Sequence, residues 1–172
     1  MSLTYAPRDT ERVLPPGTLA PDFVLPGTPG GKHNRLYSFR ERPVVLAFYP
    51  ADREPGLHRS ARPVQRLLPE FSRYDAQLFG ISVDSIWSHE AWSKDRALRF
   101  PVLSDFEPKG AVSRRYGAYD ENTGMSERAL FVIDPDGTVF WSYLSPKEGN
   151  PGADGILTAL EELKTPVAGG RR

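Results

Sequence analysis

Few side chains in this sequence could do chemistry, and cysteine is absent from all 172 positions. The absence excludes disulfides, Cys-ligated zinc, iron–sulfur clusters and every thiol mechanism for the chain as given. The histidines, His33, His58 and His89, do not have the HExxH spacing of a zinc site, so a metal centre has little support. His89, beside Trp87 and Trp92, is expected on the surface of its helix or at an interface rather than as a ligand. Glu54 and His58 could form an acid/base pair. A first-turn charge interaction between residues four apart is the simpler interpretation.

The most informative stretch is a strand-like run followed by a polar loop. Residues 44–49 (VVLAFY) are apolar or aromatic and predict a buried central strand, which Pro50 ends. Pro55-Gly56 then leads into a helical pattern. Unpaired backbone N–H groups and the helix dipole favour an anion at such a position. The residue at the tip of this loop is Leu57, which is not a nucleophile.

Helical spacing recurs along the rest of the chain. It begins at Leu57 and continues to Phe71, and Pro63 within it predicts a kink. A second helix is expected at about 86–97, capped by Asp84-Ser85, and a brief one at 110–116. Asn150-Pro151 would start a closing helix.

The predicted strands complete an α/β architecture. Residues 22–25 and 36–39 could form a first hairpin, and 76–83 a second buried strand. Residues 100–103 form a short segment that we expect at a sheet edge, because Pro101 cannot donate to a ladder. A turn at 135–137 predicts a hairpin between strands 128–134 and 138–143. The order predicts a three-layer sandwich, parallel at its centre, with helices on both faces.

Composition limits the choice of partners. The 22 basic and 22 acidic residues balance, which gives no electrostatic reason to expect nucleic acid or an anionic membrane. No apolar run approaches the roughly 20 residues of a membrane span, and we see no signal peptide, so the expected location is cytoplasmic. We expect an N-terminal arm at 1–19, one domain at 20–165 and a flexible tail at 166–172.

Three blocks of sequence resemble the peroxiredoxins, the alkyl hydroperoxide reductase/thiol-specific antioxidant (AhpC/TSA) family with a thioredoxin-like fold. Residues 20–25 (APDFVL) resemble the first strand of that family. Residues 48–56 (FYPADREPG) resemble its active-site loop, and 128–137 (RALFVIDPDG) the strand and hairpin that carry its arginine. The three blocks occur in the family's order.

The resemblance implies a site of known design. In the family the loop reads Pro-x-x-x-Thr-x-x-Cys, and the cysteine thiolate attacks a peroxide. The proline corresponds to Pro50 and the arginine to Arg128. Glu54 occupies the threonine position, Leu57 the peroxidatic cysteine position, and Ser88 lies where some relatives carry a resolving cysteine. The family uses no metal or organic cofactor.

These departures predict a cysteine-less member of the family without peroxide reduction by thiols. Leucine has no lone pair for attack, and Glu54 would compete for Arg128. Whether Leu57 is a natural loss or a replaced cysteine of an active thiol peroxidase stays open. A binding or scaffold module, as a homodimer or the partner of an active relative, is one alternative. Non-thiol chemistry on Glu54, His58 and Arg128 is another.

Two further partner predictions concern Arg128 and the last hairpin. Arg128 could hold a peroxide or a small anion, although pairing with Glu54 or another carboxylate is the simpler interpretation. The aromatic residues Phe140, Trp141 and Tyr143 should alternate between the two faces of their strand, and those left exposed could form a dimer seam.

Overall fold

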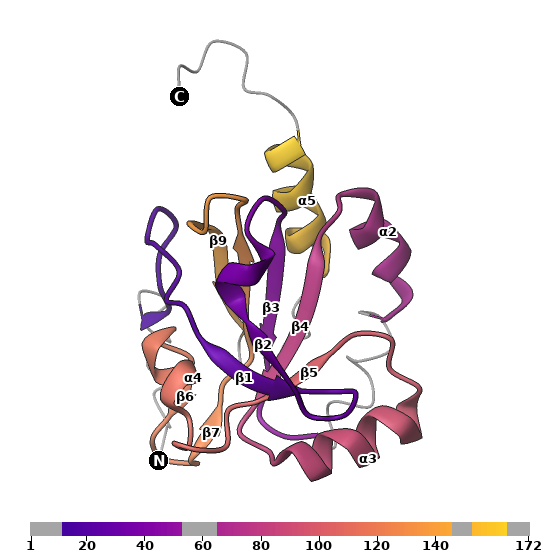
Figure 1. Ribbon diagram of the computed structural model, residues 1–172. Coiled ribbons are helices and arrows are strands. Elements are labelled where there is room, and N and C mark those ends of the chain that lie inside the picture. The colour runs from indigo at the N-terminus through magenta and orange to yellow at the C-terminus, as the bar shows by residue number, and fades with distance from the viewer. Residues whose placement is uncertain (1–11, 53–64, 146–152, 165–172) are drawn as a thin grey trace, which may run out of the picture.

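The computed structural model describes residues 12–52, 65–145 and 153–164. Seven of the strands form one mixed sheet, in the order β2-β1-β5-β4-β3-β8-β9 (Figure 1). The strands of this sheet are β1 (Val24–Gly27), β2 (Lys32–Arg35), β3 (Val44–Phe48), β4 (Gln77–Ser82), β5 (Val102–Ser104), β8 (Ala129–Ile133) and β9 (Val139–Leu144). A small separate ribbon pairs β6 (Tyr119–Asp120) with β7 (Met125–Ser126).

The centre of the sheet is parallel and its margins are antiparallel. β3 pairs in parallel with β4, and β4 pairs in parallel with β5. β8 runs antiparallel to β3 and is followed by the antiparallel β9, as the turn at 135–137 predicts. The predicted mixed sheet is confirmed.

Both faces of the sheet are covered. Successive side chains of a strand point to opposite faces of the sheet, so the core is divided into two apolar clusters. Leu46 and Phe131 belong to the first cluster, and Val45 and Val132 to the second. The helical elements are η2 (Leu36–Phe39), α2 (Leu68–Arg73), α3 (Ile86–Arg96), α4 (Ala111–Arg115) and α5 (Ala153–Lys164). Apolar residues of α2, α3 and α5 belong to the second cluster, and those of η2 and α4 to the first. Figure 1 shows α2 and α3 on one side of the strands and α4 on the other. The three-layer prediction is confirmed.

Two local features fix where the helices lie. The Ser85 side chain accepts a hydrogen bond from Ser88 N (3.3 Å), so α3 starts at the predicted cap. Gly155 lets α5 approach β9 closely, since a Cβ there would lie 2.7 Å from the Trp141 ring. α5 therefore packs over one face of the last hairpin.

Two strand predictions are wrong. Residues 36–39 form the 3₁₀ helix η2 and not a strand. The hairpin partner of β1 is β2, an outer strand with the polar sequence KHNR. A strand at the outside of the sheet does not need the apolar alternation that would have revealed it. β5 is internal, between β1 and β4. Pro101 does not force an edge because it precedes the strand, and its carbonyl oxygen accepts a hydrogen bond from Gly80 N (3.1 Å).

Some predictions lie outside the described residues, among them the kink at Pro63 and the cap at Asn150-Pro151. The domain limits stay predictions. Within the predicted arm, the described residues from 12 onward lie against the domain. Val13 is buried, and Leu14 N donates to Tyr116 O (3.2 Å).

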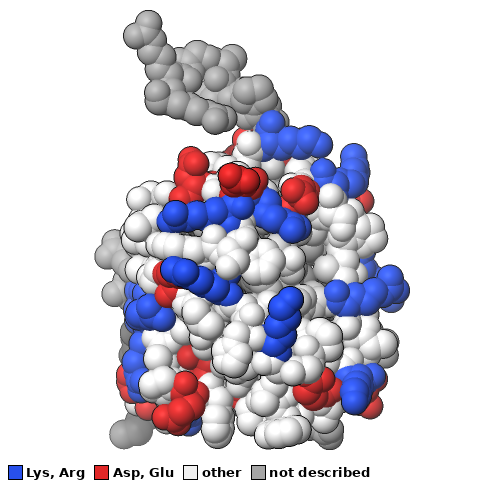
Figure 2. Space-filling model, in the orientation of Figure 1, with Lys and Arg blue, Asp and Glu red and all other residues white. Residues whose placement is uncertain are grey.

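Charged side chains of both signs are interspersed on the face drawn in Figure 2, with uncharged surface between them. This mixture agrees with the balanced count of 22 basic and 22 acidic residues. Among the helices that the structure describes, none has the length and apolar character needed to cross a membrane.

Replacement of Phe131 by alanine should lower the free energy of unfolding by about 3–5 kcal/mol, the usual cost of a phenylalanine-sized core cavity. Phe131 is fully buried, and its ring packs against Phe48 (5.6 Å) and Tyr116 (5.2 Å) between ring centres. Urea denaturation followed by circular dichroism measures the change. The control is Trp87→Ala, at a side chain 80% exposed, which should change stability by less than about 0.5 kcal/mol. Equal losses in the two variants would contradict the assigned core.

Candidate functional site

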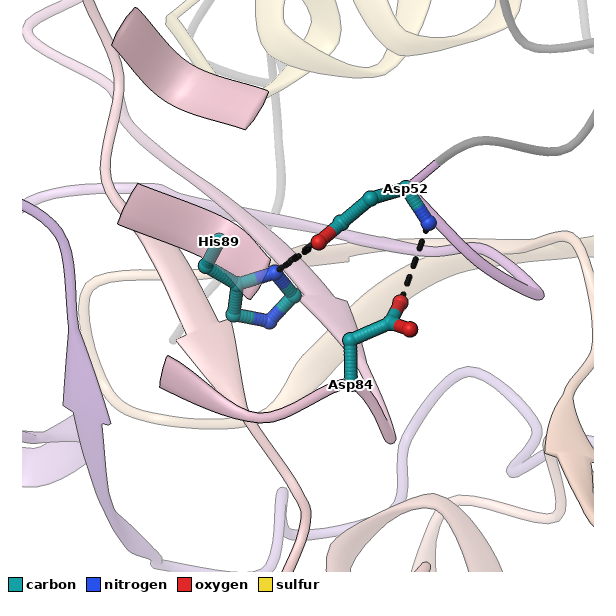
Figure 3. A group of neighbouring side chains, drawn as sticks. All are labelled: Asp52, Asp84 and His89. Atoms are coloured by element: carbon teal, nitrogen blue, oxygen red, sulfur yellow. Dashed lines mark hydrogen bonds and ion pairs between the residues drawn. The ribbon is translucent and has the colours of Figure 1, made fainter. Parts of the chain in front are cut away.

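Polar side chains gather where the parallel strands end. Asp52 follows β3, Asp84 follows β4, and His89 lies in the first turns of α3. The carboxyl ends of parallel strands meet at one edge of a sheet, which is where α/β proteins place their sites. Figure 3 shows the side chains of Asp52 and His89 pointing toward each other, with the Asp84 carboxylate toward the backbone of Asp52. The loop after β3 is thereby joined to α3 and to the end of β4.

Asp52 is the centre of this network. Its carboxylate is buried and accepts hydrogen bonds from the Tyr49 hydroxyl (2.5 Å) and the Ser88 hydroxyl (2.9 Å). His89 Nδ1 lies 2.9 Å from both carboxylate oxygens. Burial, and then the charge of Asp52, raise the pKa of Tyr49 well above its ordinary value, so the phenol remains a donor. Three donors thus satisfy one buried acidic group.

Each of the two ring nitrogens of His89 lies within hydrogen-bond distance of an oxygen atom. Nε2 lies 3.0 Å from Leu103 O, and a carbonyl oxygen can only accept, so Nε2 carries a proton. Nδ1 faces a carboxylate that already accepts from two hydroxyls, and donation from Nδ1 completes that set. The fully buried His89 side chain thus has a partner on both sides of its ring, the Asp52 carboxylate and the Leu103 carbonyl oxygen.

Asp84 extends the network to the neighbouring strands. Its Oδ2 accepts from Asp52 N (3.0 Å) and from the Ser82 hydroxyl (2.6 Å). The Ser104 hydroxyl, at the end of β5, donates to the Asp84 carbonyl oxygen (2.5 Å). The ends of all three parallel strands are therefore tied into one hydrogen-bonded unit.

The same three side chains have the composition of a metal site. One atom each from Asp52, Asp84 and His89 lies within 4.8 Å of the others. Imidazole nitrogen and carboxylate oxygen suit several divalent metals. A metal would, however, have to replace the contacts between His89 Nδ1 and the two Asp52 carboxylate oxygens. The geometry fits a structural pair that anchors a loop better than a metal centre.

The residues predicted from the family motif are placed as follows. Pro50 is half-buried and follows β3, while the half-buried Arg128 precedes β8. Phe48 is paired with Ala129, so continuing that register brings Arg128 beside Tyr49 and next to Pro50. Ser88 joins this edge of the sheet through its hydrogen bond to Asp52. The fold brings all three to the same end of the sheet.

Leu57, Glu54 and His58 lie outside the described residues. Their roles, including a Glu54–Arg128 pair and the cysteine position of Leu57, therefore stay predictions from the sequence. The roles of Pro50, Arg128 and Ser88 stay predictions as well, since their positions alone do not test chemistry.

The expectation that His89 lies on the surface of its helix or at an interface is wrong. It is fully buried, and with Tyr49, Asp52 and Asp84 it forms a network that the sequence analysis missed. One pattern could have shown this. His89 precedes the buried Trp92 by three residues, which puts both on one helix face. Asp52, in the short segment after β3, was an available partner.

Replacement of Asp52 by alanine should destabilise the fold by about 3–5 kcal/mol, because the buried Tyr49 hydroxyl, Ser88 hydroxyl and His89 Nδ1 all lose their hydrogen-bond partner. Urea unfolding monitored by circular dichroism is the measurement. Ser88→Ala is the matched control, since it removes one of the donors to the same carboxylate and should cost about 1 kcal/mol. If the Asp52 variant lost no more stability than the Ser88 variant, the Asp52 network would be disproved.

Comparison with known proteins agrees with this architecture. The profile of the AhpC/TSA family matches residues 16–142. "Peroxiredoxin 2" of Picrophilus torridus is 33% identical over 154 residues, covering 86% of this chain and 75% of the relative. "Alkyl hydroperoxide reductase E" of Mycobacterium tuberculosis is 33% identical over 127 residues, covering 72% and 80%.

Solved structures show the same fold. AhpC of Mycobacterium tuberculosis superposes with a TM-score of 0.79 at 22% identity, covering 89% of this chain and 94% of that one. Peroxidoxin BcpB from the same organism gives 0.78 at 31% identity, covering 88% and 99%. With the confirmed strand order and the family profile spanning most of its length, the chain belongs to the AhpC/TSA family, as a member without cysteine.

Proposed function

We propose that this chain is a non-enzymatic member of its family that acts as a binding or scaffold module. The observation that carries the proposal is the absence of any cysteine from a chain whose family acts through a thiolate. Leu57 stands at the nucleophile position, and Ser88, at the position of a resolving thiol, is hydrogen-bonded to Asp52. A peroxide or a small anion beside Arg128 and a cytoplasmic location, without nucleic-acid or membrane binding, belong to the same proposal.

The outer edge of β9 supports self-association. Ser145 N donates to Arg128 O, so this pair is hydrogen-bonded between the segment after β9 and the segment before β8. In an antiparallel ladder every second residue points its backbone N–H and C=O groups away from the neighbouring strand. The backbone groups of Leu144 and Ser142 therefore point outward. Val139, also outward, bonds to residues 17 and 18. No described residue pairs with the backbone of Ser142 or Leu144. β9 has no charged residue, which leaves this edge without the usual protection against pairing.

The aromatic side chains of β9 are not arranged as predicted. A register shift between Val132 and Ile133 interrupts the alternation, and Phe140 and Trp141 both pack against the same core cluster. Tyr143 stacks on Trp141 with 5.9 Å between ring centres and is 39% exposed. The support for a dimer seam is therefore the backbone edge with Tyr143 beside it, and the occupant that fits is a second β9.

The purified chain should not consume hydrogen peroxide faster than buffer when dithiothreitol or thioredoxin is the reductant, because no thiolate is available. Peroxide is measured in metal-free buffer. Leu57→Cys is the matched variant and should gain peroxide consumption, since Pro50 and Arg128 remain. Turnover by the unaltered chain would contradict the proposal and would favour chemistry on Glu54, His58 and Arg128.

Light scattering after size exclusion should show a dimer at micromolar concentrations, and Ser142→Pro should convert it to a monomer. Proline removes an N–H that points away from β8, so the pairing within the sheet is kept. Ser142→Thr, which retains the N–H, is the control and should stay dimeric. A monomeric unaltered chain, or a Ser142→Pro variant that remains a dimer with native circular dichroism, would refute this seam.

A further inference from the structure

A second surface feature lies away from the strand ends and from β9. A cleft of about 470 Å³ opens between α2 and the segment that follows α3. Its lining consists of Gln65, Arg66, Leu68, Pro69, Ser72 and Arg99. The volume is within the range of small-molecule sites.

Among the residues that the structure describes, the cleft has two positive charges and no counter-charge. Its two charged lining residues are Arg66 and Arg99, and neither guanidinium forms an ion pair or hydrogen bond with any residue that the structure describes. The acidic residues near it in sequence are already engaged by other arginines. Glu70 pairs with Arg73 (3.1 Å) and Asp95 with Arg96 (3.4 Å). Two like charges lining one cleft favour the binding of an anion there.

The walls of the cleft are braced. Gln65 Nε2 donates to Ala97 O (2.9 Å), and Arg99 N donates to Gln65 Oε1 (3.0 Å). One side chain at the start of the α2 segment thus fixes the backbone that carries Arg99. Because the cleft is held before a ligand arrives, less ordering has to accompany binding.

The chemistry of the lining specifies a ligand class. Guanidinium groups bind phosphate oxygens through paired N–H donors more effectively than point charges do. Leu68 and Pro69 add an apolar wall for the remainder of a ligand. We propose that this cleft binds a small phosphorylated molecule carrying at least two negative charges, with Arg66 and Arg99 as its phosphate contacts. The site goes beyond the scaffold function and does not depend on it.

Calorimetric titration of the full chain with inorganic pyrophosphate at physiological salt tests the site. Pyrophosphate presents the charge and the oxygens that the two arginines require. The variants are Arg66→Gln and Arg99→Gln, and the matched control is Arg73→Gln, in α2 beside the cleft but paired with Glu70 and outside the cleft lining. Circular dichroism verifies that each variant is folded.

Saturable binding by the unaltered chain, weakened about tenfold or more by each cleft variant and less than about twofold by Arg73→Gln, is the expected result. Absence of saturable binding at millimolar pyrophosphate would overturn the proposal. So would equal weakening in all three variants, because binding would then follow diffuse surface charge. Neither outcome depends on peroxide consumption or on the dimer seam.

Discussion

The contact between Asp52 and His89 is the constraint on which this end of the molecule depends. It joins the loop after β3 to α3 in the fully buried interior, and Asp84 connects the same loop to β4. A buried polar group without a partner would be costly there, whereas a carboxylate, an imidazole ring and two hydroxyls together satisfy one another. The pair fixes the position of Asp52. It thereby also fixes the point at which the loop toward Leu57 leaves the sheet. Scaffold geometry is thus retained at the start of a loop that lacks the family's reactive atom.

The overall fold could be predicted because local and global patterns agree. Residues 44–49 and 129–133 are buried on both faces and read as continuous apolar strands, and Ser85 has the chemistry of a helix cap. The errors fall where tertiary context decides. β2 has no apolar alternation because it lies at the outside of the sheet. β5 is internal, which Pro101 allows because it stands just before the strand. Neither fact is contained in local sequence.

The site could be predicted only in part. The family motif predicted a site that includes Pro50 and Arg128, and the order of the strands brings these two residues to the same end of the sheet. It did not indicate that Asp52 and His89 meet, because they are 37 residues apart and a hydrogen bond between them requires the three-dimensional path of β4. The buried location of His89 was available from its spacing to Trp92, but a lone histidine was assigned to the surface. The pattern of apolar residues in a sequence predicts which positions are buried, but it does not predict which polar side chains form hydrogen bonds with one another.

The pairing of residues 17 and 18 with Val139 limits how far another strand could extend along β9. That N-terminal stretch occupies the first outward position, so only the last half of the strand is left for a neighbour. The stability of a junction with so few backbone bonds would depend on the protein concentration. Such a junction also favours exchange of subunits, which would let this chain alternate between copies of itself and a related protein with a matching border strand.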